Sequence, residues 1–277
     1  MDRLDYLLRD SHSTGVPYGN IDLNYIVNNL RVSPSGILGV NKKALSAVEH
    51  ALIARFFMHK TVYYHKTTYG IEEAMRQLIR RMRPIEEYGL PSAGKNVREL
   101  ASGVQLLDFT DAYIDARVNQ ATKSNDKIIA ALAHAISRRQ PPRLLKEVSQ
   151  FIDRKEKKYN AANTFRRRCQ NDLKALSKKY KVPLGLFLYC ETKPVTFEKR
   201  GSSFTADELK DTDIIHDNEI VQVFLDGKEP VSIMDVPHSL LNVLSNKVLM
   251  THRLYVAAAL TDTDLNKIRS EVAQWDA

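Results

Sequence analysis

The sequence predicts a mainly α-helical protein with a C-terminal α+β lobe. Apolar residues recur at helical spacing through most of the first two-thirds of the chain. Short runs rich in β-branched and aromatic residues follow residue 182. A strongly basic stretch lies between these two parts. We therefore expect a helical domain at 1–142, a basic helical connector at 143–182 and the α+β lobe at 183–277.

The helical part is expected to hold six helices separated by turn-forming residues. The first has an apolar stripe that includes Leu4 and Leu7, and it ends in a loop marked by Gly15, Pro17 and Gly19. A Pro- and Gly-rich break at 83–96 divides the remainder. The other helices are expected at 22–32 (with an Asp at its start), 43–69, 71–82, 107–119 and 124–138.

The lobe after residue 182 is expected to combine strands with two short helices. DGKE at 226–229 is typical of a hairpin turn, and TADE at 205–208 and TDTD at 261–264 are helix-capping patterns. The strands are expected at 183–190, 220–226, 231–235 and 253–259. The last helix would place four apolar residues on one face: Leu265, Ile268, Val272 and Trp275.

Composition excludes several classes of protein. No apolar run approaches the roughly 18 residues that a membrane-spanning helix needs, so no membrane partner is expected. The N-terminus is charged from residue 2, which does not fit a secretory signal. Cys169 and Cys190 are too few for a disulfide framework, and we expect both to be reduced thiols. The predicted location is the cytoplasm.

Two short motifs resemble functional sites only superficially. GLPSAGKN at 89–96 has the glycines and lysine of a phosphate-binding loop, but it lacks the preceding strand and the final Ser or Thr. IIHD at 214–217 has a His–Asp pair without a second His at ligand spacing. Both are predicted to be surface turns.

The basic connector carries the whole positive charge of the chain. Residues 143–182 contain 13 Lys and Arg against 4 Asp and Glu, whereas the rest of the chain holds 28 against 29. One interpretation is a solvated helix face. The other is a contact surface for phosphate-rich partners, either nucleotides at a subunit interface or nucleic acid.

Two predicted helices carry polar stripes. Asp2, Tyr6 and the adjacent Arg9 and Asp10 share one face of the first helix at 3.6 residues per turn. Arg55, His59 and Tyr63 follow one another at intervals of four residues on the long helix. An arginine guanidinium can donate two hydrogen bonds to phosphate oxygens, and a histidine can donate a hydrogen bond or a proton. This series of side chains therefore suits a polyphosphate. An exposed edge of an amphipathic helix is the alternative.

Three ordered segments carry a resemblance to a known family. MDRLDYLLRDSHSTGV, IDLNYIVNNLRV and AVEHALIARFFMHKTVYYHKTT resemble the HD-superfamily metal-dependent phosphohydrolases of the deoxynucleoside triphosphate triphosphohydrolase type. The resemblance covers roughly residues 1–83 and continues weakly through 106–118 and 128–143. It implies that 1–142 is the C-terminal part of an HD-type helical domain.

The resemblance also implies roles for individual residues. Asp2 matches the last metal-ligating aspartate, and Arg3 matches a basic residue at the triphosphate. Tyr6 and Asp10 match residues that pack against the sugar and read its 3′ hydroxyl. The implied catalytic residues are Arg55 and His59, which also match phosphate contacts, and the remaining implied substrate contacts are Tyr63, Tyr64 and, with His65 beside it, Lys66.

The family holds its divalent metal (Mg, Mn, Fe or Zn) with two His and two Asp, and three of these ligands precede the matched segment. We therefore expect that this chain does not hold the metal alone and is inactive alone. The expected partner is a nucleoside triphosphate. Because Leu4, Leu7 and Val48 are expected to lack neighbours, a homo-oligomer is also predicted. The alternative function is a non-catalytic nucleotide- or nucleic-acid-binding or assembly module.

Overall fold

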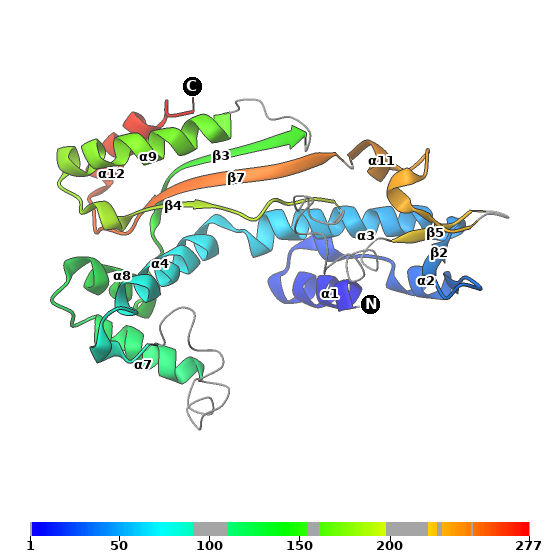
Figure 1. The fold of residues 1–277 in the computed structure, drawn as a ribbon, viewed down its shortest axis with the longest axis horizontal. Helices are drawn as coiled ribbons and strands as arrows, with labels where there is room; N and C mark the ends of the chain where they lie inside the picture. Colours follow the sequence, from blue (N-terminus) through cyan, green and yellow to red (C-terminus); the bar gives the residue numbers. More distant parts are fainter. Residues whose placement is uncertain are drawn as a thin grey trace. The chain divides into compact units, whose positions relative to one another are not determined.

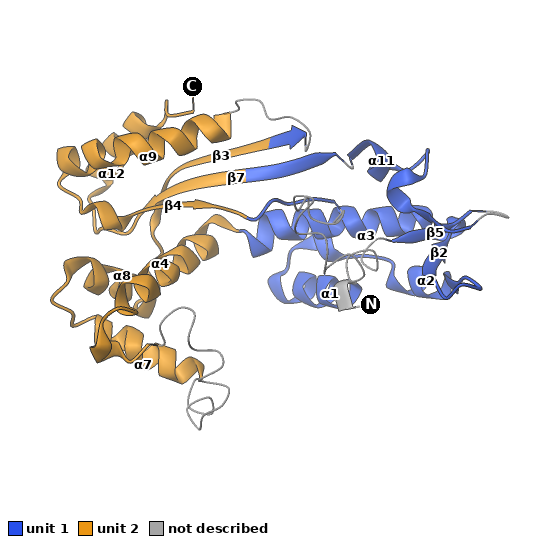
Figure 2. Cartoon of the chain, in the orientation of Figure 1, with its two compact units in different colours: residues 1–64, 151–157, 193–250 blue, residues 65–150, 158–192, 251–277 orange. Residues whose placement is uncertain are grey.

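The computed structural model describes residues 2–90, 110–153, 161–197, 221–225, 229–244 and 246–276, with the side chains of residues 2 and 3 excepted (Figure 1). The chain divides into two compact units (Figure 2). Unit 1 consists of residues 1–64, 151–157 and 193–250, and unit 2 consists of residues 65–150, 158–192 and 251–277. Most of the secondary structure is helical, which confirms the predicted fold class.

Unit 1 combines helices with a small sheet. Asp22 caps its second helix, since its side chain accepts a hydrogen bond from the Tyr25 amide. The sheet has the order β1-β2-β5-β6, in which β2 and β5 are parallel and the other two pairs are antiparallel. The elements are α1 (Asp2–Thr14), η1 (Pro17–Gly19), α2 (Leu23–Asn28), β1 (Leu30–Val32), β2 (Leu38–Asn41), η2 (Lys42–Ala44), α3 (Leu45–Met58), the π-helical turn η3 (His59–Tyr63), β5 (Gln222–Phe224), β6 (Val231–Ser232), η7 (Ile233–Asp235) and α11 (Leu240–Leu244).

The core of unit 1 lies between α1, α3 and the sheet. Leu7 and Val48 are buried in it, and Leu4 packs against it half-buried. The expectation that these three residues lack neighbours is therefore wrong, because residues of the later segments, such as Val223 and Ile233, complete the same core. The homo-oligomer stays a prediction, but Leu4, Leu7 and Val48 no longer support it.

Unit 2 packs helices against a three-stranded sheet of order β3-β7-β4. β4 and β7 run antiparallel, with Phe187 opposite Val256 and Glu191 opposite His252. The elements are α4 (Lys66–Met82), η4 (Glu86–Tyr88), α7 (Asp111–Ala121), α8 (Lys127–Ser137), β3 (Arg143–Asp153), α9 (Ala161–Tyr180), η5 (Leu184–Leu186), β4 (Phe187–Glu191), β7 (Lys247–Val256) and α12 (Asp262–Val272), and the end of β3 and the start of β7 fall within unit 1.

The last helix matches its sequence signal closely. Thr261 caps α12 by accepting a hydrogen bond from the Asp264 amide at 3.2 Å. The four apolar residues predicted to share one face are all buried: Leu265, Ile268, Val272 and Trp275. The TDTD pattern and its apolar face are therefore confirmed.

Three local expectations are wrong. The helix predicted at 43–69 is two helices, because the chain widens into η3 and leaves the helical conformation before α4 begins at Lys66. The helix predicted at 22–32 ends at Asn28, and β1 follows. The connector begins as strand β3 instead of a helix. The roughly helical spacing of the sparse apolar residues in 143–182 predicts a helix, but pairing with β7 makes the first part a strand.

Some predicted features lie outside the described residues. They are the TADE helix start at 205–208, the IIHD turn at 214–217, most of the DGKE turn and most of the GLPSAGKN loop. The strands on either side of DGKE, β5 and β6, do pair antiparallel, as a hairpin requires. In the described residues no helix is long and apolar enough to span a bilayer.

Phe56 and Phe57 offer a matched test of the unit 1 core. Phe56 is buried, and its ring stacks on Phe197 with 4.4 Å between centroids, whereas Phe57 is 37% exposed. Phe56→Ala is expected to lower the free energy of unfolding by about 3 to 5 kcal/mol because it leaves a cavity. Phe57→Ala should cost clearly less. Equal losses in chemical denaturation would contradict this placement of the core.

Candidate functional site

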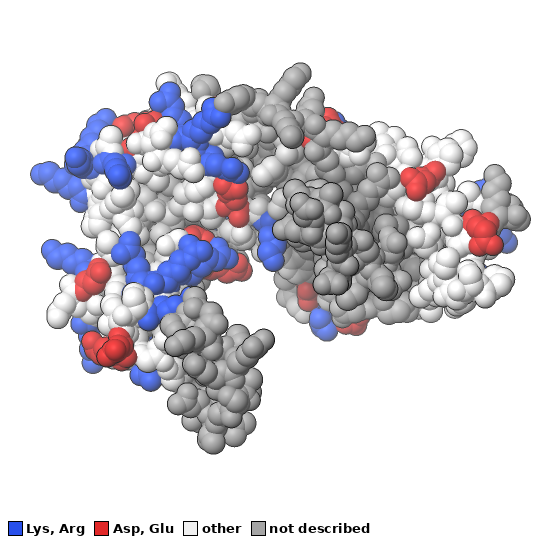
Figure 3. All heavy atoms as spheres, viewed as in Figure 1, with Lys and Arg blue, Asp and Glu red and all other residues white. Residues whose placement is uncertain are grey.

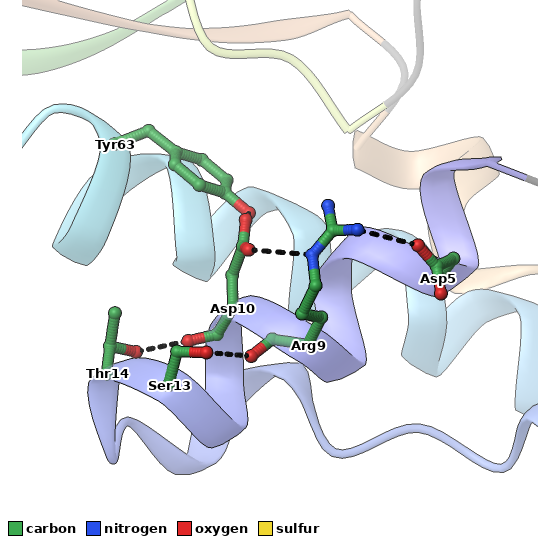
Figure 4. A network of polar contacts seen from close by, with 6 residues as sticks. All are labelled: Asp5, Arg9, Asp10, Ser13, Thr14 and Tyr63. Carbon is green, nitrogen blue, oxygen red and sulfur yellow. Dashed lines mark hydrogen bonds and ion pairs between the residues drawn. The ribbon is translucent and has the colours of Figure 1, made fainter.

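A hydrogen bond joins α1 to the π-helical turn η3. The Tyr63 hydroxyl donates to Asp10 Oδ2 at 2.7 Å, across 53 positions of sequence (Figure 4). Both side chains are partly buried. The polar stripes of the two predicted helices therefore meet at this point.

Aromatic rings surround this hydrogen bond. The Tyr6 ring contacts the Tyr63 ring edge-on at 6.0 Å between centroids. His59 contacts Tyr63 at 4.9 Å and Tyr64 at 5.8 Å, again edge-on. The structure thus brings together five of the predicted site residues, all in unit 1: Tyr6, Asp10, His59, Tyr63 and Tyr64.

The π-helical turn explains why Tyr64 joins this group. In an α-helix a residue five positions after His59 would point roughly 140° away from it. Here the Tyr64 amide donates to the His59 carbonyl at 2.8 Å, which is the i to i+5 bond of a π-helix. The wider turn lets both Tyr63 and Tyr64 contact His59. Such turns occur frequently at functional sites.

The orientation of His59 is set by its own helix. Its Nδ1 lies 2.9 Å from the Arg55 carbonyl oxygen. Because a carbonyl only accepts, Nδ1 carries the proton, and the neutral ring has its lone pair on Nε2. The side chain is therefore held in one tautomer.

The carboxylate of Asp10 has charged neighbours on α1. Arg9 Nε lies 3.7 Å from Asp10 Oδ1, and Arg9 Nη1 pairs with Asp5 at 3.1 Å (Figure 4). The polar stripe predicted from the sequence includes Arg9 but not Asp5, although their spacing of four residues indicates this ion pair. Two hydroxyls close the last turn of the helix: Ser13 donates to the Arg9 carbonyl, and Thr14 donates to the Asp10 carbonyl.

The environment raises the pKa of Tyr63. Burial is the largest cause, and the hydrogen bond and negative charge of Asp10 add to it. Tyr63 is therefore a neutral hydroxyl at physiological pH. Its proton is committed to Asp10, so its oxygen is left as a hydrogen-bond acceptor.

Arg55 carries a buried donor for which no described residue supplies an acceptor. Its Nε is buried and makes no hydrogen bond to another described residue. A buried guanidinium nitrogen left in this way costs free energy unless a ligand or water satisfies it. An anionic group would supply that acceptor.

The remaining predicted residues are not brought into this group by the described part of the chain. The side chains of Asp2 and Arg3 lie outside it, although both residues belong to α1. Lys66 and His65 belong to unit 2. There His65 accepts a hydrogen bond from the Thr67 amide at the start of α4, and the Lys66 carbonyl accepts one from Tyr255.

The side chains described do not fit the implied divalent metal. Among them, no three His, Cys, Asp or Glu residues are grouped as a metal ion requires. Asp2, the one ligand that the resemblance implies, has no described side chain. We therefore derive no catalytic step through a metal.

Comparison with known proteins supports the resemblance to HD-type proteins. Residues 21–90 match the family model described as HD associated region. An uncharacterized Methanocaldococcus jannaschii protein, MJ1154, is 32% identical over 127 residues, which are 43% of this chain and 27% of that protein. The uncharacterized Bacillus subtilis protein YwfO is 32% identical over 88 residues, which are 32% of this chain and 20% of that protein.

Two solved structures share the fold. One is a phosphohydrolase from Bacteroides thetaiotaomicron, with a TM-score of 0.60 and 19% identity over 92% of this chain and 60% of that chain. The other is a hypothetical protein from Aquifex aeolicus, with a TM-score of 0.59 and 20% identity over 98% of this chain and 56% of that chain. This chain thus spans a quarter or so of the two curated relatives and over half of both solved chains.

Tyr63→Phe is expected to reduce the loss of stability at alkaline pH. The pKa of folded Tyr63 lies above that of an unfolded tyrosine, so its contribution is complete below about pH 10 and is lost as the pH rises through the folded-state value. Between about pH 9 and about pH 11 the wild type should therefore lose more free energy of unfolding than the variant. Tyr25→Phe, at an exposed ring, should keep the wild-type profile. Parallel profiles for all three proteins would contradict the assignment.

Proposed function

We propose that this chain supplies the substrate-binding part of an HD-type phosphohydrolase that acts on deoxynucleoside triphosphates. The hydrogen bond between Tyr63 and Asp10 is the observation that carries the proposal. The match to the HD associated region and the fold shared with a phosphohydrolase support the reaction class. The nucleotide as substrate rests on the resemblance and on the chemistry of the grouped residues.

The Tyr63–Asp10 pair suits a sugar hydroxyl. Tyr63 presents an acceptor oxygen, and Asp10 presents a carboxylate beside it. A sugar hydroxyl would donate its one proton either to the Asp10 carboxylate or to the Tyr63 oxygen, and a sugar without this hydroxyl loses that hydrogen bond. Tyr6, edge-on to Tyr63, would pack against the sugar ring.

Arg55 and His59 suit the phosphates. Arg55 Nε is a buried donor that needs an acceptor, and phosphate oxygens fit the guanidinium fork. His59 would accept or donate a proton through Nε2, because Nδ1 is held by the Arg55 carbonyl. In this proposal these two are the catalytic residues, and Tyr64 together with Tyr63 lies against sugar and base.

The proposed reaction requires a divalent metal, most of whose ligands are not among the described residues. When bound, it would activate water and polarise the phosphoryl oxygen. The proposal assigns Asp2 as one ligand and leaves the others to residues outside those described. A non-catalytic nucleotide- or nucleic-acid-binding or assembly module is the second candidate, favoured by the basic stretch at 143–182. Release of inorganic triphosphate in the presence of Mn²⁺, with the upstream metal-ligating segment supplied in trans, separates the two.

A nucleotide lacking the 3′ hydroxyl tests the sugar contact. The wild-type chain should bind a 2′-deoxynucleoside triphosphate at least about 10-fold more tightly than its 2′,3′-dideoxy analogue, because a hydrogen bond to a charged group contributes about 1.5 to 3 kcal/mol. In Tyr63→Phe this preference should shrink, and in Tyr25→Phe it should persist. Calorimetric titration measures both. Equal affinity of the wild type for the two nucleotides would refute the sugar contact.

Arg55→Ala tests the phosphate contact separately. The variant should lose about 10-fold or more in affinity for the triphosphate and much less for the nucleoside alone, since the nucleoside has no phosphate to contact. Arg31→Ala removes an exposed arginine of the same unit and is the matched control. If both variants bind the triphosphate equally well, Arg55 has no such role.

A further inference from the structure

We propose that one face of α9 is a docking surface for double-helical nucleic acid, formed by Lys174, Lys178 and Lys181. This surface lies in unit 2, and the proposal does not depend on the nucleotide site of unit 1. Within a basic stretch of 40 residues it selects three exposed lysines, two on one face of α9 and one directly after the end of that helix.

Unit 2 carries the excess charge of the molecule. Its residues include 25 Lys and Arg against 16 Asp and Glu, whereas unit 1 has 16 against 17. In Figure 3 basic side chains gather over the region where Figure 1 draws α9. An anionic partner is therefore attracted to this unit.

α9 buries one side and exposes the other. Phe165, Cys169 and Leu176 are buried, and α9 packs on β4 and α12. At 3.6 residues per turn, Lys174 and Lys178 project from the side opposite these three. The exposed line consists of Arg167, Asn171, Lys174 and Lys178, and Lys181 follows directly after the helix.

Several other basic residues in the described part of the stretch are already paired. Arg166 makes a double contact with Glu191, and Arg168 pairs with Asp172. Lys179 pairs with Glu271 on α12. By contrast, Lys174, Lys178 and Lys181 form no ion pair with any other described residue and are all exposed. Their charge is available to a partner.

The backbone supports the inclusion of Lys181. Its φ is +53°, the left-handed conformation that usually takes glycine at the end of a helix. A side chain there costs of order 1 kcal/mol. Lys181 thus adds one more exposed charge directly after the end of α9. At the helical rise per residue, Lys174 to Lys181 span roughly 10 Å. This length corresponds to about three phosphates of one strand, since each takes about 3.4 Å of the duplex axis.

The composition of the line favours a duplex over a single strand. Single-strand binding relies on aromatic rings on which bases stack, and the line from Arg167 to Lys181 presents none among its exposed members. Tyr180, next to it, donates its hydroxyl to Glu271. Contacts through phosphates alone fit sequence-independent binding to a double helix.

A salt titration of duplex binding tests the proposal with a matched pair of triple variants. One is Lys174→Gln with Lys178→Gln and Lys181→Gln. The control is Lys123→Gln with Lys127→Gln and Lys267→Gln, at exposed lysines of unit 2 outside α9, so both proteins change net charge equally. Binding to a 20-base-pair duplex is followed by fluorescence anisotropy, with the single strand and phosphatidylserine vesicles as further arms.

The wild type should bind the duplex with a steep dependence of log affinity on log salt. Each phosphate contact contributes about 0.9 to this slope, so the α9 variant should lose close to 3 units of slope while the control keeps the wild-type slope. Equal loss in both variants would overturn the proposal, since diffuse charge would explain it. Preference for the single strand or the vesicles, or no duplex binding at low salt, would also overturn it.

Discussion

The hydrogen bond from Tyr63 to Asp10 is the constraint on which the candidate site depends. It joins the first helix of the chain to a turn more than fifty residues later, and it fixes a proton between two groups that would otherwise be separate. Tyr6 and His59 both contact the Tyr63 ring edge-on, so this ring lies at the centre of the group.

The π-helical turn is what makes that geometry possible, and it was not predictable from spacing. Intervals of four residues correctly indicated that His59 and Tyr63 share a face. They gave no sign that Tyr64 would contact His59 as well, because that contact requires a wider turn than an α-helix has. Local capping signals were more reliable: Asp22 and Thr261 each accept the predicted amide bond, since a cap depends on only three or four neighbouring residues.

Long-range packing accounts for the expectations that failed. Leu7 and Val48 are covered by segments that follow much later in the chain, and periodicity within α1 or α3 carries no information about those segments. Strand β3 was expected to be part of a helix because the apolar residues of the basic stretch fall roughly at helical spacing, whereas pairing with β7, a strand about 100 residues later, makes it a strand. The roles of the candidate site residues in binding and catalysis remain predictions, because fold similarity below 25% identity concerns the fold alone.

The central claim is that Tyr6, Asp10, Arg55, His59 and Tyr63 bind one deoxynucleoside triphosphate. Nuclear magnetic resonance of the chain with ring-labelled tyrosines, titrated with that nucleotide, tests it most directly. The account predicts that the ring signals of Tyr6 and Tyr63 shift together and saturate, while Tyr113 and Tyr255 of unit 2 keep their positions. Saturable shifts confined to unit 2, with Tyr6 and Tyr63 unmoved, would contradict it.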